Sequence, residues 1–178
     1  GLGVAPEMYI QKSRDNSENW DVYTTVIDGS HDYLHLNTTA VKADSGLTAP
    51  TSTVIYRGSA DSNGEKKIIY CFSSVASYSK FGSYTGNGSS DGTFVFTGFR
   101  PAWVMIKRTS GTQNWRLFDN KRNPFNDVDL NLQANTSGAE FESSAYNALD
   151  FLSNGFKLVG TNADEGTNQN GQTYIYLA

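Results

Sequence analysis

The sequence has few of the residues from which catalytic sites are usually built. Its 178 residues include two histidines, His31 and His35, and one cysteine, Cys71. A single cysteine excludes an intrachain disulfide, and a small apolar side chain in a strand is the expected role of Cys71. The carboxylates are scattered singly along the chain. We therefore expect no catalytic residues, no metal site and no cofactor.

The sequence is also poor in positive charge and in long apolar runs, which argues against nucleic acids and membranes as partners. The net charge is -4 and the isoelectric point is near 5.1, with no basic stripe to attract a nucleic acid. No apolar run approaches the roughly 20 residues needed to cross a bilayer, so no membrane insertion is expected. Charged residues make up only 18% of the chain and aromatic residues 13%, a balance typical of β-rich proteins with extracellular-type surfaces.

What the sequence does contain is an internal repeat. Residues 3–23 and 98–118 follow the same pattern, with Trp20 matching Trp115 at an offset of 115 − 20 = 95. The match resumes at Asn37 and Asn135, where the offset is 135 − 37 = 98, so three residues were added in a loop. A unit that recurs with its strands intact and its loops varied indicates a duplicated supersecondary module.

Short alternating runs of apolar and polar residues, separated by Gly, Asn, Asp and Ser, predict an all-β fold. We predict two tandem homologous antiparallel β-sandwich units, lectin-like or jelly-roll-like, over residues 1–79 and 80–178. Residues 92–97 open the second unit without a counterpart before Gly3. The first unit is therefore expected to lack its N-terminal strand, and the chain to be a fragment of a longer polypeptide. Strands are expected at 20–27, 33–37, 52–57, 67–72, 93–99, 103–107, 115–119, 130–134, 155–159 and 173–178.

Two connecting segments carry signals of their own. Apolar residues at three- and four-residue spacing predict a helix over 139–152, whereas the matching 41–50 is expected to be a loop. Between the units, 78–84 and 94–96 flank a Gly- and Ser-rich turn. This pattern predicts a hairpin that joins the two units rigidly.

The aromatic residues are the strongest candidates for ligand contact. Trp20 and Trp115, like Tyr23 and Phe118, hold equivalent repeat positions, where packing is the favoured role and sugar stacking the alternative. Aromatic residues that the repeat does not echo are better candidates for contact with a partner. They are Tyr78, Tyr84, Phe125 and Tyr146.

Several alternatives remain open at this point. The four-residue spacing of His31 and His35 would suit a metal pair on a helix, but their surroundings alternate like a strand, which favours ordinary surface or turn roles. Loops 61–65 and 162–168 offer oxygen ligands without the acidic spacing of a calcium loop. A glycosidase would need two carboxylates about 5 to 10 Å apart in a cleft.

Three Asn-x-Ser/Thr triplets begin at Asn37, Asn87 and Asn135. They would accept glycans in a secreted eukaryotic chain. Because Asn37 and Asn135 hold equivalent repeat positions, a turn capped by the asparagine side chain is the simpler explanation.

A family resemblance rests on residues 78–88 and 98–108, supported by 152–158 and 174–178. With these blocks the chain resembles a module common in bacteriophage tail-fibre and other virion-appendage proteins, especially those of marine phages, and the likeness covers essentially the entire chain. It implies a non-catalytic structural protein at the virion surface. The implied partners are other virion subunits, a further copy of the chain, with a trimer as one arrangement, and host surface glycans. The alternatives are a carbohydrate-binding module of a cell-surface or secreted protein, and an accessory domain of a hydrolase.

Overall fold

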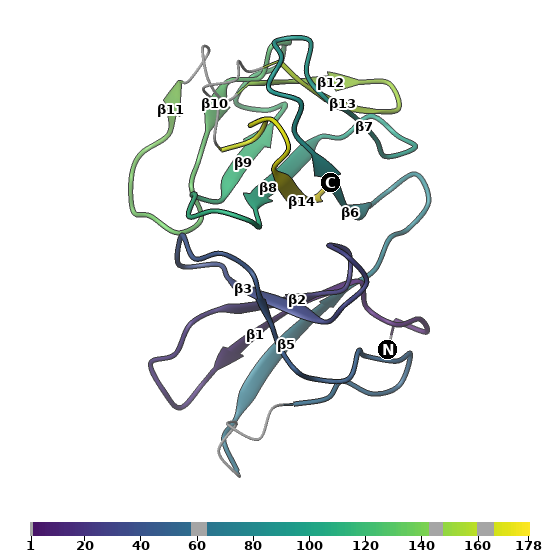
Figure 1. Cartoon of the computed structure of the whole chain (residues 1–178), viewed down its shortest axis with the longest axis vertical. Helices are drawn as coiled ribbons and strands as arrows, with labels where there is room; N and C mark the ends of the chain where they lie inside the picture. Colours follow the sequence, from purple (N-terminus) through teal and green to yellow (C-terminus); the bar gives the residue numbers. More distant parts are fainter. Residues whose placement is uncertain (1, 58–63, 143–147, 160–165) are drawn as a thin grey trace.

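A computed structural model describes residues 2–57, 64–142, 148–159 and 166–178, and within these ranges every regular element is a β-strand (Figure 1). The first half of the chain contributes β1 (Met8–Ser13), β2 (Asp21–Thr24), β3 (Asp32–His35), β4 (Ala43–Asp44) and β5 (Lys67–Phe72). The second half contributes β6 (Phe81–Thr85), β7 (Phe94–Phe96), β8 (Trp103–Arg108), β9 (Arg116–Asp119), β10 (Leu130–Asn131), β11 (Phe141–Glu142), β12 (Leu149–Leu152), β13 (Gly155–Leu158) and β14 (Thr173–Leu177). The predicted all-β class is confirmed. None of the described segments forms a helix long and apolar enough to cross a membrane.

The strands form three main sheets, and every strand pair in them is antiparallel. The first sheet has the order β4-β3-β2-β1-β5, the second β6-β14-β8-β9 and the third β12-β13-β7. The small β10-β11 pair joins the second sheet at its β9 edge through a bridge between Leu117 and Leu132. In Figure 1 the first sheet fills the lower half of the molecule and the other sheets fill the upper half.

Two hydrophobic cores lie between these sheets. One lies between the first and second sheets and draws on both halves of the chain. Its buried members are Met8, Val22, Leu34, Phe81, Met105, Trp115, Ile175 and Leu177. The other lies between the second and third sheets, and its buried members are Tyr84, Val95, Val104, Ile106, Phe118, Val128, Leu149, Phe151, Phe156, Leu158, Tyr174 and Tyr176. The second sheet is therefore the middle layer and is buried on both faces, which explains the near-continuous apolar run in β8.

The strand registers recur between the two halves. Tyr9 faces Tyr23 across β1 and β2, and Val104 faces Phe118 across β8 and β9, so both partners are shifted by 95 residues. Likewise the β3–β4 register returns in β10–β11 at the 98-residue offset. The β1–β5 register returns in β8–β14, with β5 and β14 offset by 107 residues. The sheet order β4-β3-β2-β1-β5 thus corresponds strand for strand to β11-β10-β9-β8-β14, while the division into sandwich units at residues 79 and 80 stays a prediction.

The predicted helix over 139–152 is wrong wherever the structure describes that segment. Phe141 lies in β11, and Leu149 begins β12. Leu149 and Phe151 are buried on one face of β12 and pair with Leu158 and Phe156 of β13. The alternation with a period of two residues determines the local structure here, because it lets β12 complete the third sheet.

Two further predictions are also wrong. Residues 52–57 form no strand, since the chain turns back with Thr51 N–H bonded to Val54 O at 2.8 Å. The expected hairpin between 78–84 and 94–96 does not form either. β6 pairs with β14 and β7 pairs with β13, so the connection crosses from the middle layer to the third sheet.

Candidate ligand-binding groove

The outer face of the first sheet carries the candidate site. Alternate residues of its strands point away from the core that the two halves share, among them Tyr23 and Tyr33. In the second half the third sheet covers the equivalent face, which is apolar along β8 and β14 and carries the buried, mutually bonded Arg116 and Asn131 on β9 and β10. In the first half a groove of about 610 Å³ lies over this face instead. It is lined by Ser17, Glu18, Asn19, Asp21, Tyr23, Tyr33, His35, Asn37, Ser45, Leu47 and Lys67.

A row of aromatic rings runs along this face. Tyr9 is buried and stacks on Tyr23 with ring centroids 4.8 Å apart. The ring of Tyr33 lies 5.9 Å from Tyr23, and His35 meets Tyr33 edge to face at 5.4 Å. Tyr23 and Tyr33 are half-buried and line the groove. Each ring is held by its neighbours, so the groove has a rigid aromatic wall.

Charged side chains flank the aromatic wall in pairs. His35 Nδ1 lies 2.8 Å from Asp21 Oδ1, and Lys67 Nζ lies 3.2 Å from Glu18 Oε2. Burial raises the pKa of Asp21, and the hydrogen bond with His35 opposes that shift in part. The groove therefore presents hydrogen-bonding groups of both charge signs beside the rings.

A buried histidine supports the aromatic wall from behind. His31 Nε2 lies 3.2 Å from the hydroxyl of Tyr9, and His31 Nδ1 lies 2.8 Å from the hydroxyl of Ser45. The imidazole stacks on Tyr23 with centroids 5.4 Å apart. Burial lowers the pKa of His31, with opposing contributions from Asp32 and Asp44. The ring therefore acts as a neutral bridge between β1 and the loop after β4.

A pair of hydrogen-bonded asparagines, Asn19 and Asn37, forms part of the groove lining. The backbone N–H of Trp20 donates to Asn37 Oδ1 at 2.9 Å, and the Asn37 amide donates to Asn19 Oδ1 at 3.0 Å. The same arrangement recurs in the second half, where Asn135 accepts from Trp115 N–H at 2.9 Å. Each asparagine bonds to the residue before the neighbouring strand and not within its own turn, so the predicted turn cap is corrected, and Asn37 is held in place at the groove.

The residues selected from the sequence lie elsewhere. Tyr78 is 80% exposed before β6 and Phe125 is 81% exposed after β9, and neither lines the groove. Tyr84 is only 8% exposed, stacks on Tyr174 at 5.1 Å and donates its hydroxyl hydrogen to Thr167 O at 2.7 Å. Because Tyr84 completes a core, its predicted role as a partner-facing ring is corrected. Tyr146 lies outside the described residues.

The groove residues differ from their counterparts in the second half. Asp21 of the first half matches Arg116 of the second, and Tyr33 matches Asn131 at the 98-residue offset. Tyr23 matches Phe118, which lies in the core beneath the third sheet. Tyr23, for which the repeat left sugar stacking as the alternative to packing, is the aromatic residue named from the sequence that lines the groove.

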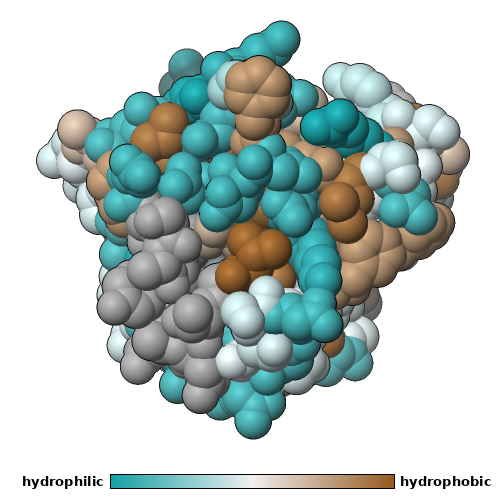
Figure 2. All heavy atoms as spheres, turned by 90° about the horizontal axis from the view of Figure 1, so that it is seen from above, coloured by the Kyte–Doolittle hydropathy of each residue, from teal (hydrophilic) through white to brown (hydrophobic). Residues whose placement is uncertain are grey.

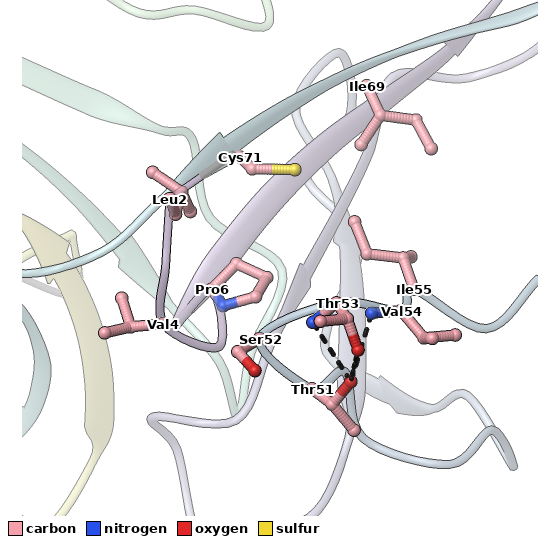
Figure 3. A pocket seen from close by; sticks show the side chains of 10 residues that line it. All are labelled: Leu2, Val4, Pro6, Thr51, Ser52, Thr53, Val54, Ile55, Ile69 and Cys71. Carbon is pink, nitrogen blue, oxygen red and sulfur yellow. Dashed lines mark hydrogen bonds between the residues drawn. The ribbon is translucent and has the colours of Figure 1, made fainter.

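A second cavity, of about 390 Å³, lies beside β5 (Figure 3). Side chains from the N-terminal segment, from 51–55 and from β5 surround it. They are those of Leu2, Val4, Pro6, Thr51, Ser52, Thr53, Val54, Ile55, Ile69 and Cys71. Burial raises the pKa of the Cys71 thiol, which keeps it neutral and unreactive. Seen from its upper end, by contrast, the molecule is mostly hydrophilic with scattered apolar side chains (Figure 2).

Within the described ranges, no cluster of three or more His, Cys, Asp or Glu side chains is placed to hold a metal ion. His31 and His35 bond to Ser45 and Asp21 respectively. Residues 58–63 and 160–165 lie outside the described part of the chain, so the structure does not describe the core of either oxygen-rich loop.

One family model matches this chain, over residues 1–178, and it is a domain of unknown function, DUF7483. No curated protein matches the chain, and no solved structure matches it.

Proposed function

We propose that this chain, which belongs to the DUF7483 family, is a non-catalytic module of a phage virion appendage and binds host-surface saccharides in the groove over its first sheet. One observation carries the proposal. Among the described residues, the third sheet covers this face in the second half, whereas in the first half the face is open and lined by aromatic and hydrogen-bonding side chains. An uncovered face gives up the stability that a second core would provide. Ligand binding is the simplest explanation for leaving it uncovered.

The composition of the groove suits a sugar. A pyranose ring has an apolar face of C–H groups, which packs on an aromatic ring, and a rim of hydroxyls, which need donors and acceptors. Tyr23 and Tyr33 supply half-exposed rings. Asp21 and Asn37 supply oxygen and amide groups whose positions are fixed by other hydrogen bonds. Groups held in place in this way lose little entropy when a ligand binds.

Binding without chemistry is the role that fits the charged groups. A glycosidase acid and base act on opposite sides of one glycosidic bond, whereas Asp21 is bonded to His35 and Glu18 to Lys67 beside the rings. We therefore assign Asp21 and Glu18 to hydrogen bonding with sugar hydroxyls.

The virion location is supported by the sequence resemblance to tail-fibre modules. A shallow site on a displayed protein binds one saccharide weakly, and several copies on one particle raise the overall affinity without new contacts. Detection of this chain by mass spectrometry in purified phage particles is the expected result. Its recovery only from uninfected cells would favour the alternative of a cellular carbohydrate-binding module.

A glycan array with matched variants tests the groove itself. We expect the whole chain to bind a restricted set of saccharides and Tyr33→Ala to weaken that binding at least tenfold. Tyr78→Ala is the control, because it removes an exposed ring outside the groove, and it should bind like the wild type. Loss of binding in Tyr78→Ala but not in Tyr33→Ala would move the site, and absence of binding to any saccharide would overturn the proposal.

A further inference from the structure

The charged side chains of the groove differ in how far a ligand can reach them. The lining residues that can carry charge are Glu18, Asp21, His35 and Lys67. The side chain of Lys67 is only 5% exposed, whereas that of Glu18 is 41% exposed. The side chain of Asp21 is 21% exposed. A ligand in the groove therefore has better access to the two carboxylates than to the ammonium group.

The positive charge of Lys67 is shared between two carboxylates. Its Nζ lies 3.2 Å from Glu18 Oε2 and 3.4 Å from Oε2 of Glu65, whose side chain is buried. Asp21 is near enough for the charges of both Lys67 and Glu18 to act on it. Three carboxylates against one ammonium group leave this part of the groove with a net charge of −2. The charge stays negative even when the imidazole of His35 is protonated.

Each of the two accessible carboxylates keeps one oxygen for a ligand. Asp21 uses Oδ1 for His35 at 2.8 Å, and Glu18 uses Oε2 for Lys67. Within the described ranges of the chain, Asp21 Oδ2 and Glu18 Oε1 make no hydrogen bond. An ionised carboxylate accepts hydrogen bonds and cannot donate them. The ligand must therefore bring donors to this side of the groove.

The aromatic rings lie next to these carboxylates on the same face of the sheet. Asp21 and Tyr23 are alternate residues of β2, and their partners across β3 are His35 and Tyr33 respectively. The face of an aromatic ring carries partial negative charge and attracts a cation. A protonated amine is therefore attracted by the rings and by the carboxylates at once, whereas an acidic group is repelled by both.

We propose that the groove selects saccharides that carry a free amino group, with the ammonium ion held between the rings of Tyr23 and Tyr33 and the carboxylates of Asp21 and Glu18. This inference rests on the proposed function and names the class of saccharide. The amino group takes the place of one of the sugar hydroxyls that the two carboxylates would otherwise bind.

The burial of Asp21 adds to this preference. Burial raises the pKa of Asp21, because partial removal from water disfavours the ionised carboxylate. A bound ammonium ion offsets that cost, whereas a bound carboxylate, phosphate or sulfate group would increase it. Saccharides that bear acidic groups are therefore excluded from the groove.

The test uses the whole chain and an array that presents each saccharide skeleton in three matched forms, with a free amine, with the amine acetylated and with a carboxylate. We expect the amine form of the bound skeletons to bind about tenfold more tightly than the acetylated form. The carboxylate form should not bind. Raising the salt concentration should weaken binding of the amine form alone, because salt screens the attraction between exposed charges.

Variants that remove one charge locate the preference in the groove. Glu18→Gln and Asp21→Asn keep the size of the side chain, and each should reduce the preference for the amine form by about threefold. Asp91→Asn is the matched control, because it removes the same charge from an exposed carboxylate outside the groove. It should keep the full preference. An unchanged circular dichroism spectrum shows that each variant is folded.

The outcomes separate this inference from the proposed function. Equal or tighter binding of the acetylated or carboxylate form would overturn the inference and leave saccharide binding in the groove standing. An undiminished preference in both Glu18→Gln and Asp21→Asn, or its loss in Asp91→Asn, would also overturn the inference, since the preference would then not arise in the groove. Absence of binding to every form would overturn the inference and the proposed function together.

Discussion

The indole Nε1–H of Trp115 donates a hydrogen bond to the backbone carbonyl of His35 at 2.9 Å. Trp115 is fully buried in the core between the two halves, and the side chain of His35 lines the groove on the other face of β3. One hydrogen bond therefore connects the shared core to the candidate binding face. The repeat equivalent, Trp20, is 38% exposed at the rim of a surface pocket that it shares with Ala134 of the second half.

The two tryptophans provide a matched pair for stability. Trp115→Phe removes buried ring volume and leaves the His35 carbonyl without its donor, so we expect it to lower the free energy of unfolding by about 2–4 kcal/mol. Trp20→Phe changes a half-exposed ring and should lower it by under about 1 kcal/mol. Chemical denaturation of both variants measures the difference. Equal effects would mean that the two halves do not share a core.

The sequence predicted the strands far better than the layers. The repeat offset of 95 matched β1 with β8 and β2 with β9 as equivalent strands, and their registers agree. Alternation reveals which residues share a face of a strand but not what covers that face. The packing of the first sheet on the second, and the absence of a cover over the groove, were therefore beyond the sequence.

The candidate site shows the same limit in individual residues. Tyr84 and Tyr33 are both tyrosines in short alternating strands, yet one lies in a core and the other in the groove. The difference comes from the third sheet, whose strands in the described part of the chain all belong to the second half and cover Tyr84. Phe156 packs against Tyr84 but lies far from it in the sequence. The local pattern of residues around Tyr84 therefore does not reveal that its ring is covered.

Lys107 should make stability depend on alkaline pH. It is fully buried between the halves, and its Nζ donates to Arg108 O at 2.7 Å. Burial, and next the charge of Arg108, lower the pKa of Lys107 from 10.5 to about 8. Between these values the unfolded chain binds more protons than the folded chain, so stability rises with pH. Between pH 8 and pH 9.5 the free energy of unfolding of the wild type should therefore rise by about 2 kcal/mol more than that of Lys107→Met.

The equivalent Lys12 is the control for this measurement. Its Nζ also bonds to the carbonyl of the next residue, Ser13, at 3.2 Å, but the side chain is only half-buried. Lys12→Met should keep the wild-type rise in stability between pH 8 and 9.5. The assignment to Lys107 is wrong if Lys107→Met retains the rise or if Lys12→Met loses it.

His31 should make stability fall at mildly acidic pH. Burial lowers the pKa of His31 below the ordinary value of 6.5. The stability that depends on the neutral ring is complete above pH 6.5 and is lost as the pH falls through the folded pKa, because the unfolded chain binds the proton more readily. His31→Gln keeps a hydrogen-bonding side chain and removes the titration. We expect a shallower loss of unfolding free energy between pH 7 and pH 5 in this variant.

A variant weakened elsewhere tests whether that slope belongs to His31. Trp115 lies in the core between the first and second sheets. Trp115→Phe should therefore lower the overall stability and keep the wild-type dependence of stability on pH. A steeper slope in His31→Gln than in the wild type would contradict the assignment, since it would place the acid sensitivity in other groups.

Gly155 should be essential to the third sheet, because β7 and β13 approach each other closely at this position. A Cβ atom at Gly155 would lie 2.1 Å from Val95 O, which is backbone of the paired strand β7 and can move only if the strands separate. Gly155→Ala should therefore lower the free energy of unfolding by about 2–4 kcal/mol. Gly138→Ala, with its nearest atom 3.5 Å away, should change it by less than about 0.5 kcal/mol.

Binding of the fluorescent dye ANS should rise in Gly155→Ala alone, because loosening of β7 and β13 uncovers Val104 and Phe118. A fully stable Gly155→Ala that binds no ANS would show that the third sheet is not required to cover this face, and the difference between the two halves would lose its physical basis.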